Sequence, residues 1–351
     1  MVRKRSAVPG AITSMKAIVY RRNGEPAEVL ALEDIPEPAA PGPKEVAIRL
    51  VKCMVHPIDD LLIRGYIPEP IPHGGAVPGG DGVAVVEQVG SDVDPSSGIV
   101  PGARVVLFPV HGTWVERMVV PETAVFPVPA DVSDEAASQV VINGITAIML
   151  MRHALAAQSV VGAASPLLVT AAGSSVARNV IALARIRGTK VVALVRSDAS
   201  AAILTESFEG LPVVSTEKEE WRAAVAGAHG RSPSVAIDPI GGAMAPDLLG
   251  VLSDHGTLLT YGGLDPQPSQ ISTITLTVRS QAVKGVNAPS WITTTTPEQR
   301  VRDIADLFAI VRSAPQNFTE YSEFALADAV SALSAASASP RRGATILKFG
   351  I

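Results

Sequence analysis

The chain has 351 residues, which at about 150 residues per domain allows two domains and a sizeable core. Hydrophobic residues make up 47% and charged residues 18%, a composition that excludes global disorder. The formal net charge of −5 offers no basic face for nucleic acid. No run of about 18 apolar residues indicates a membrane span. The single cysteine, Cys53, excludes an internal disulfide and a multi-cysteine zinc site. We expect a soluble, cytoplasmic protein that binds neither nucleic acid nor membrane.

The N-terminal segment 1–14 is basic, with Arg3, Lys4 and Arg5, but it has no apolar core. Pro9 and Gly10 interrupt it early. A secretory signal needs an uninterrupted apolar stretch after its basic start. The segment is therefore expected to be a disordered leader before the first strand.

The first part of the chain has the composition of a small β domain. Proline is frequent before residue 130, and it removes a backbone donor and fixes φ, which favours short strands joined by shaped loops. Between these loops lie runs of β-branched and apolar residues at 16–20, 45–51, 83–89, 104–108 and 115–120. Several short strands at such spacing predict a compact β barrel or sandwich.

From residue 133 the pattern changes to alternating helices and strands. Ser133 is a good N-cap for a helix that starts at 134, and Asn143-Gly144 predicts a break in that helix. Apolar runs of two to five residues then alternate with helical segments, at 167–170, 191–195, 213–214, 234–238 and 257–261. Such runs are typical of a parallel sheet covered on both faces, a doubly wound α/β domain.

The turn after the first of these strands is the candidate nucleotide site. Parallel sheets bind ligands at the carboxyl ends of their strands, and a helix N-terminus attracts phosphate. The glycine fingerprint falls on Ala172, Ser174 and Ala177, so none of its three positions is glycine. The turn is still built of small residues. We take the following as coenzyme contacts: Gly173, Ser174, Ser175 and Val176. A strand–helix turn that binds no nucleotide is the alternative.

The end of the second strand bears on the choice of coenzyme. Sites selective for NAD carry Asp or Glu there, to hold the ribose 2′-hydroxyl. This chain carries Arg196 and Ser197, which suit a 2′-phosphate and favour NADPH. Asp198 keeps NAD open, and a surface arginine without a ligand is the alternative.

Taken together, this domain order resembles the medium-chain dehydrogenase/reductase superfamily, from Met15 nearly to the end of the chain. The segment 54–68 (MVHPIDDLLIRGYIP) is similar to the superfamily's N-P-x-D…R-G-x-Y pattern. Within the superfamily the chain is most similar to 2-enoyl thioester reductases of the mitochondrial type, with quinone reductases as near relatives. The segments that carry this resemblance are Gly112–Trp114, Asn143 with Thr146-Ala147, Ile240–Gly242 and Gly256–Gly263.

The resemblance implies a fold and a domain division. A GroES-like catalytic domain is expected to comprise residues 1–133 and 297–351, and a Rossmann-like coenzyme domain residues 134–296. The zinc-binding branch has a cysteine where this chain has His56 and a histidine where it has Gly80. One imidazole without thiolate partners does not assemble a catalytic zinc site in that mode. The expected enzyme is therefore independent of zinc.

The resemblance also implies roles for single residues. Tyr66 matches the proposed proton donor, with a loop tyrosine packed on prolines as the alternative. His56 stands where the family has asparagine; it is taken as catalytic, with a hydrogen-bonded histidine as the alternative. Trp114 and Trp291 match residues that line the substrate cleft, although large aromatics are often core. Further coenzyme contacts are expected at Asn143, Thr146, Tyr261, Gly262 and Gly263.

The leading interpretation is a reductase that uses NADPH to reduce an activated C=C bond, with an enoyl thioester or a related α,β-unsaturated carbonyl compound as substrate. An NADPH:quinone oxidoreductase is the second interpretation. The third is a catalytically silent nucleotide-binding relative. A homodimer is expected from the family, with the coenzyme-domain sheets paired edge to edge through residues 281–286.

Overall fold

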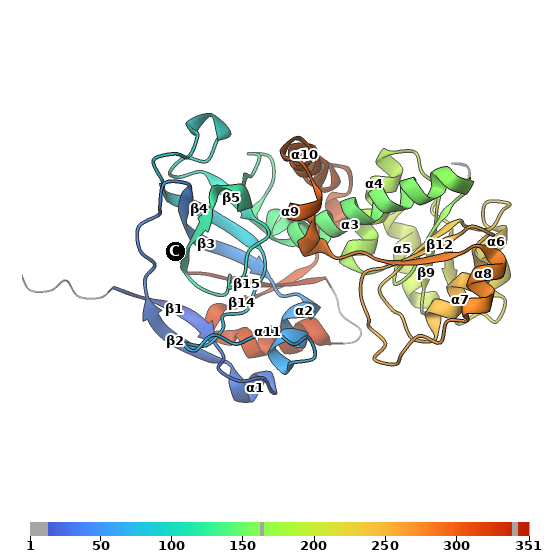
Figure 1. Cartoon of the computed structure of the whole chain (residues 1–351), viewed down its shortest axis with the longest axis horizontal. Coiled ribbons are helices and arrows are strands. Elements are labelled where there is room, and N and C mark those ends of the chain that lie inside the picture. Colours follow the sequence, from blue (N-terminus) through green and yellow to red (C-terminus); the bar gives the residue numbers. More distant parts are fainter. Residues whose placement is uncertain (1–12, 162–164, 339–342, 351) are drawn as a thin grey trace, which may run out of the picture. The chain divides into compact units, whose positions relative to one another are not determined.

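The computed structural model describes residues 13–161, 165–338 and 343–350 (Figure 1). Most of the expected leader, 1–14, lies outside the described residues. The chain forms two compact units, one made of residues up to 141 together with those from 320 onward, and the other of residues 142–319.

The first unit is built on a seven-stranded sheet and a separate two-stranded hairpin. In the sheet the order is β14-β15-β3-β4-β5-β7, and β6 pairs with the first half of β3. Its elements are β1 (Ser14–Val19), α1 (Pro26–Val29), β2 (Ala31–Pro36), β3 (Glu45–Met54), α2 (Pro57–Arg64), β4 (Gly82–Val89), β5 (Arg104–Leu107), β6 (Arg117–Pro121), β7 (Val125–Pro127), β14 (Tyr321–Ala325), α11 (Ala329–Ser337) and β15 (Ala344–Lys348).

Alternation of apolar residues places the core of this unit on one face of the sheet. In β3, Val46, Ile48 and Leu50 are fully buried while the residues between them are partly exposed. Successive side chains of a strand point to opposite faces, so period-two burial is the pattern of a half-covered antiparallel sheet. Helix α11 packs against β14 and β15 and closes part of this core (Figure 1). The predicted β-rich domain is confirmed.

The second unit is a six-stranded parallel sheet in the order β10-β9-β8-β11-β12-β13. This is the doubly wound order in which the chain starts at β8 in the middle, winds outward, and then returns to the other side of β8. Its elements are β8 (Leu167–Val169), α4 (Ser175–Ile186), β9 (Val191–Val195), α5 (Asp198–Ser207), β10 (Val213–Ser215), α6 (Trp221–Gly227), β11 (Val235–Asp238), α7 (Met244–Val251), β12 (Thr257–Thr260), α8 (Thr273–Arg279), β13 (Ala282–Gly285), α9 (Trp291–Thr294) and α10 (Pro297–Ser313).

Helices cover both faces of this sheet. Leu168, Ala236 and Leu258 pack with side chains of α6 and α7 on one face. On the other face lies α4, which in turn contacts α10 (Figure 1). Both faces are buried, which explains why these strands read as continuous apolar runs. The predicted Rossmann-like doubly wound sheet is confirmed.

Helix α3 (Asp134–Val161) is continuous, so the predicted break at Asn143-Gly144 is wrong. A glycine inside a helix costs about 1 kcal/mol, and burial of apolar neighbours such as Val141, Ile145 and Ile148 outweighs it. By length and composition its segment 134–160 could cross a membrane, although polar residues interrupt its apolar runs. However, 67% of its most apolar part is buried inside the protein, which is typical of a core helix.

The unit boundaries differ from the predicted ones at 133 and 297. Residues 134–141 belong to the first unit, since Glu135 forms an ion pair with Lys52 of β3. Residues 297–319 belong to the second unit, because α10 packs on α4 and Arg178 donates a 3.0 Å hydrogen bond to Asn317. The predicted boundaries follow the start and the end of the alternating strand–helix pattern in the sequence. In the structure, side-chain contacts decide with which unit each segment packs.

A buried carboxylate on α10 joins three segments of the second unit. Asp303 is 1% exposed and accepts hydrogen bonds from Arg152 of α3 at 2.6 Å, from the Trp291 indole at 2.7 Å and from Gln299 at 2.8 Å. A buried charge is tolerated only when it is paired and hydrogen-bonded in this way. Asp303 is therefore the point at which α3, α9 and α10 are held together.

We expect Asp303→Ala to lower the free energy of unfolding by about 3 kcal/mol, because it leaves the Arg152 guanidinium and the buried Trp291 N–H without their acceptor. Urea denaturation measures this difference. Asp306→Ala is the matched control on the same helix: Asp306 is 39% exposed and pairs with Arg187, so the change should be about 1 kcal/mol or less. Equal effects of the two substitutions would contradict the assignment.

Candidate coenzyme and catalytic sites

The turn from β8 into α4 has the geometry expected of a phosphate site. Ala171 has φ 44°, in the left-handed region that favours glycine, so the alanine holds a tight turn at some conformational cost. Ser174 caps α4, and its Oγ accepts the Ala177 N–H at 3.4 Å. Apart from its two chain neighbours, no described residue has a heavy atom within 4 Å of the place that a Cβ on Gly173 would take. The turn is thus open to a ligand at the helix N-terminus, and its residues fit a dinucleotide.

A hydrogen-bond network joins the carboxyl ends of β8 and β11. Asp238 is fully buried, and its carboxylate accepts hydrogen bonds from the Thr170 hydroxyl and, at 2.8 Å, from the Gly241 N–H. These strands are neighbours at the point where the strand order reverses. Asp238 therefore has the structural role that its position at a strand end indicates.

At the end of β12, Tyr261 lies beside the same turn. Its hydroxyl is buried next to Ser174, and burial raises the pKa of Tyr261 above its usual range. Gly262 is closely packed, since a Cβ there would lie 3.0 Å from the Pro239 carbonyl oxygen. At Gly263 a Cβ would meet no atom of the described residues within 4 Å, its chain neighbours apart. The structure thus brings Ser174, Tyr261 and Gly263 to one edge of the sheet.

The end of β9 carries the predicted determinants of coenzyme choice. Arg196 is exposed, and within the described residues its guanidinium has no protein partner. Ser197 is the N-cap of α5, where its Oγ accepts the Ser200 N–H at 3.2 Å. The arginine is therefore available to an anion, while the serine hydroxyl already has a partner.

Asn143 and Thr146 lie one turn apart on α3, and each is 6% exposed. The Thr146 hydroxyl donates to the Ile142 carbonyl oxygen at 2.6 Å, the ordinary state of a threonine inside a helix. Their predicted role as coenzyme contacts stays a prediction.

In the first unit, a buried polar cluster surrounds His56, which precedes α2. The His56 ring Nε2 lies 3.1 Å from Asp81, a carboxylate that is 0% exposed. The backbone N–H of His56 donates to Asp59 at 2.7 Å. Burial raises the pKa of Asp59 to about 6, although the His56 charge and its N–H lower it. His56 itself is 4% exposed. This geometry corresponds to the hydrogen-bonded histidine that the sequence left as the alternative.

Tyr66 has a different environment, although it lies at the other end of the same helix. Gly65 ends α2 with φ 79°, and Tyr66 follows it with 72% of its surface exposed. Its role as the proton donor and the alternative role of a loop tyrosine both stay predictions. Helix α2 has eight residues and rises about 12 Å, so it separates His56 from Tyr66. The two predicted catalytic residues are not brought together within this unit.

The two tryptophans predicted to line the substrate cleft are both fully buried. Trp291 donates its indole N–H to Asp303 and serves the packing of the second unit. Trp114 lies against Gly79, where a Cβ would approach its ring to 2.5 Å. Burial favours the core role that the sequence left open, and a cleft role stays a prediction.

Sequence reasoning missed the partners of these residues. Neither Asp81 nor Asp59 is among the site residues predicted from the sequence. Asp81 lies near His56 because β4, which begins directly after Asp81, pairs antiparallel with β3, which ends two residues before His56. Asp59 is near His56 because it lies in the first turn of the helix that His56 precedes. A polar residue in an otherwise small and apolar segment, as in Pro78–Val83, is the signal that could have pointed to Asp81.

No group of three or more His, Cys, Asp or Glu side chains that could hold a metal ion occurs among the described residues. The expected independence from zinc fits this observation and the identities of His56 and Gly80, and it stays a prediction.

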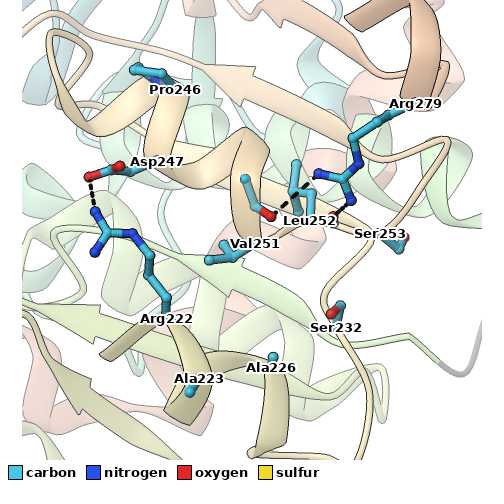
Figure 2. A pocket seen from close by; sticks show the side chains of 11 residues that line it. Arg222, Ala223, Ala226, Ser232, Pro246, Asp247, Val251, Leu252, Ser253 and Arg279 are labelled. Atoms are coloured by element: carbon cyan, nitrogen blue, oxygen red, sulfur yellow. Dashed lines mark hydrogen bonds and ion pairs between the residues drawn. The ribbon is translucent and has the colours of Figure 1, made fainter. Parts of the chain in front are cut away.

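A cavity of about 490 Å³ lies at the opposite edge of the parallel sheet (Figure 2). It is lined by α6, α7 and the segments that lead into β11, β12 and β13. Arg222 pairs there with Asp247 at 2.7 Å, and Arg279 donates to the Leu249 carbonyl oxygen at 2.8 Å and to Asp254 at 2.9 Å. The cavity is at the amino ends of the strands and its cations are paired within the protein, so it is not the candidate coenzyme site.

Two family models match the chain. Residues 42–130 match the alcohol dehydrogenase GroES-like domain, and residues 176–307 match the zinc-binding dehydrogenase model. The mitochondrial enoyl-[acyl-carrier-protein] reductase of Homo sapiens is 29% identical over 340 residues, which cover 94% of this chain and 87% of that protein. The Arabidopsis thaliana enzyme of the same name is 30% identical over 284 residues, which cover 79% and 73%.

Solved structures of oxidoreductases are also similar to this chain. A quinone oxidoreductase from Pseudomonas syringae has a TM-score of 0.81 at 25% identity and covers 95% of this chain and 99% of its own. A mycobacterial protein complexed with NADPH has the same TM-score and identity and covers 95% and 100%. The fold and the site at its switch point define an NAD(P)-type oxidoreductase. The chain belongs to the medium-chain dehydrogenase/reductase superfamily, in which its relatives include enoyl reductases and quinone oxidoreductases.

The raised pKa of Asp59 predicts a specific pH dependence of stability. Between about pH 4 and pH 6 the folded state holds Asp59 protonated while the unfolded chain has lost that proton, so this contribution to stability is lost as the pH rises. Asp59→Asn, which stays neutral, should gain stability relative to the parent across this window, by about 3 kcal/mol at most. Urea denaturation at pH 4, 5, 6 and 7 measures the difference.

Asp94→Asn is the control of opposite sign, since hydrogen bonds from Ser96 lower the pKa of Asp94. The Asp94 variant should therefore lose stability relative to the parent as the pH rises. A difference for Asp59→Asn that does not change with pH would show that burial does not raise the pKa of Asp59.

Proposed function

We propose that this protein is a zinc-independent, NADPH-dependent reductase of an activated C=C bond, with a 2-enoyl thioester or a related α,β-unsaturated carbonyl compound as substrate. The observation that carries the proposal is the similarity to enoyl-[acyl-carrier-protein] reductases over nearly the whole chain. The open turn at Gly173 and the unpaired Arg196 support the binding of NADPH.

When bound, NADPH supplies a hydride to the β carbon of the substrate. The proposed tasks of the chain are to bind the pyrophosphate at the α4 N-terminus, through Ser174, Ser175 and the backbone of Gly173 and Val176, and to attract the 2′-phosphate with Arg196. Tyr66 is the proposed donor of the proton at the α carbon, because its phenol is exposed and carries a transferable proton.

His56 has a positioning role in this proposal. Its ring is fixed by Asp81, and its N–H and the Asp59 carboxylate close the first turn of α2. The pair therefore sets where α2 begins, and the eight residues of α2 set where Tyr66 lies.

A quinone oxidoreductase is the second candidate, favoured by the likeness to the Pseudomonas syringae structure.

We also propose a cytoplasmic homodimer. The dimer is supported by β13, which within the described residues is an edge strand that pairs with β12 alone. Apolar side chains are exposed nearby, with Val283 40%, Ile274 72% and Val278 79% exposed. Light scattering should give twice the chain mass of 36.4 kDa.

The paired-substrate assay separates the candidate functions. NADPH oxidation, followed at 340 nm with a metal chelator present, should be at least about tenfold faster in kcat/KM with crotonyl-CoA than with a benzoquinone, because binding energy from the thioester is used at the reacting bond. Faster turnover of the quinone would transfer the assignment to the second candidate. Both enzymatic functions would be overturned if fluorescence titration showed no binding of NADPH or NADH in the micromolar range.

The proton-donor assignment is tested by Tyr66→Phe. Loss of a general acid should lower kcat about 100-fold or more and leave the Kd for NADPH unchanged. Tyr321→Phe is the control, since Tyr321 is also a partly exposed tyrosine of the first unit, on β14. If Tyr66→Phe kept full turnover, the donor would be another group.

A further inference from the structure

Charged side chains gather where β9 and β10 end, and one of them bears on the choice between the two nicotinamide coenzymes. We propose that Glu217 is the residue that sets this choice: its carboxylate favours a ribose 2′-hydroxyl, weakens the binding of a 2′-phosphate, and so keeps NADH as an accepted coenzyme beside NADPH. This inference rests on the proposed coenzyme site at the carboxyl edge of the parallel sheet.

The backbone brings Glu217 to the end of the neighbouring strand. β10 runs parallel to β9, with Ser215 opposite Val195 in the last register pair. The Thr216 N–H donates to the Val195 carbonyl oxygen at 2.9 Å, which continues the pairing by one residue. Glu217 follows directly. Because parallel strands end at the same edge of a sheet, residues 216–218 lie beside residues 196–198.

The carboxylate of Glu217 occupies an anion position at the start of α5. Its Oε2 accepts the backbone N–H of Asp198 at 2.9 Å. Asp198 is the first residue of the ten-residue helix α5, so this N–H is one of the free donors at a helix N-terminus. A phosphate bound there would have to compete with the carboxylate for the same donor.

In dinucleotide-binding sheets, an acidic side chain at the end of the second strand accepts a hydrogen bond from the ribose 2′-hydroxyl. The second strand here is β9, and it is followed by Arg196, Ser197 and the acid Asp198, whose carboxylate lies 3.9 Å from the Lys218 ammonium. Glu217 adds a second carboxylate from the third strand, within hydrogen-bond distance of the Asp198 N–H.

Cations at the same place act in the opposite direction. The exposed Arg196 has no protein partner among the described residues, and the Lys218 ammonium lies 3.9 Å from the Asp198 carboxylate. The guanidinium attracts a 2′-phosphate, whereas Glu217 repels it. Water screens these exposed charges, so the effect of one carboxylate is about tenfold in Kd, well short of the effect of a buried charge.

The experiment measures dissociation constants without turnover. Glu217→Gln keeps the size of the side chain and an acceptor for the Asp198 N–H, and it removes only the charge. Fluorescence titration with NADPH and NADH, and calorimetry with 2′,5′-ADP and 5′-ADP, report on the 2′ position with and without the nicotinamide. We expect Glu217→Gln to lower the Kd for NADPH and 2′,5′-ADP about tenfold, and to leave that for NADH and 5′-ADP unchanged or raised.

Glu219→Gln is the matched control, an exposed glutamate two residues further on, and it should change none of the four constants by more than twofold. Arg196→Gln should act in the opposite direction and raise the Kd for NADPH and 2′,5′-ADP. Thermal denaturation verifies that each variant is folded, and Glu217→Asp, which retains the charge, should keep the parent's preference.

Each outcome bears on the inference. The role of Glu217 in coenzyme choice would be overturned if Glu217→Gln changed the ratio of the Kd values for NADH and NADPH by less than twofold. An equal weakening of both coenzymes would show that Glu217 only stabilises the start of α5, and would overturn it too. If the parent chain binds neither coenzyme, the proposed function itself fails, which the parent titration shows before any variant is made.

Discussion

The buried carboxylate of Asp238 is the interaction on which the coenzyme half of this molecule depends. It accepts hydrogen bonds from the Thr170 hydroxyl of β8 and the Gly241 N–H beyond β11, and so ties together the two strands on either side of the switch point. The turn that follows Thr170 keeps its shape without glycine at the three fingerprint positions, because its backbone is held from both sides. The Ala172 N–H donates to the Leu194 carbonyl oxygen of β9 at 3.1 Å, and Ser174 caps α4. The turn between β8 and α4 therefore has the shape expected of a nucleotide site although it is poor in glycine.

Two buried carboxylates, Asp81 and Asp59, organise the first unit in a comparable way. Asp81 fixes the His56 ring, and Asp59 accepts the His56 N–H, so that the start of α2 is held by charged groups inside the core. Buried charges are costly, and the raised pKa of Asp59 expresses that cost. The hydrogen bonds that these carboxylates form fix the residue at which α2 begins, and they offset the free energy of burying charge. Helix α2 then carries Tyr66 to the surface at its other end, where the phenol meets solvent.

Side chains of opposite charge lie at the ends of β9 and β10, at the proposed coenzyme site. Arg196 and Glu217 come from different strands, and each favours a different substituent on the ribose. Their balance can change by substitution at either position without altering the sheet. The two nicotinamide coenzymes differ by one phosphate, and a site with both charges distinguishes them by a modest factor.

The sequence by itself determined the superfamily, the division into a β-rich and a doubly wound α/β part, and those strands that are β-branched or apolar runs. The strands β2, β7, β13, β14 and β15 are not among them. The features that the sequence determined follow from local patterns: period-two burial in β3, continuous apolar runs in strands buried on both faces, and turn residues between them. Only the tertiary structure decided that α3 continues through Asn143-Gly144, that 297–319 packs with the second unit, that His56 is buried against Asp81 while Tyr66 is exposed, and that Glu217 lies beside Asp198. Each of these depends on contacts between residues distant in the chain, since burial and strand pairing override local propensity and local sequence carries no record of them.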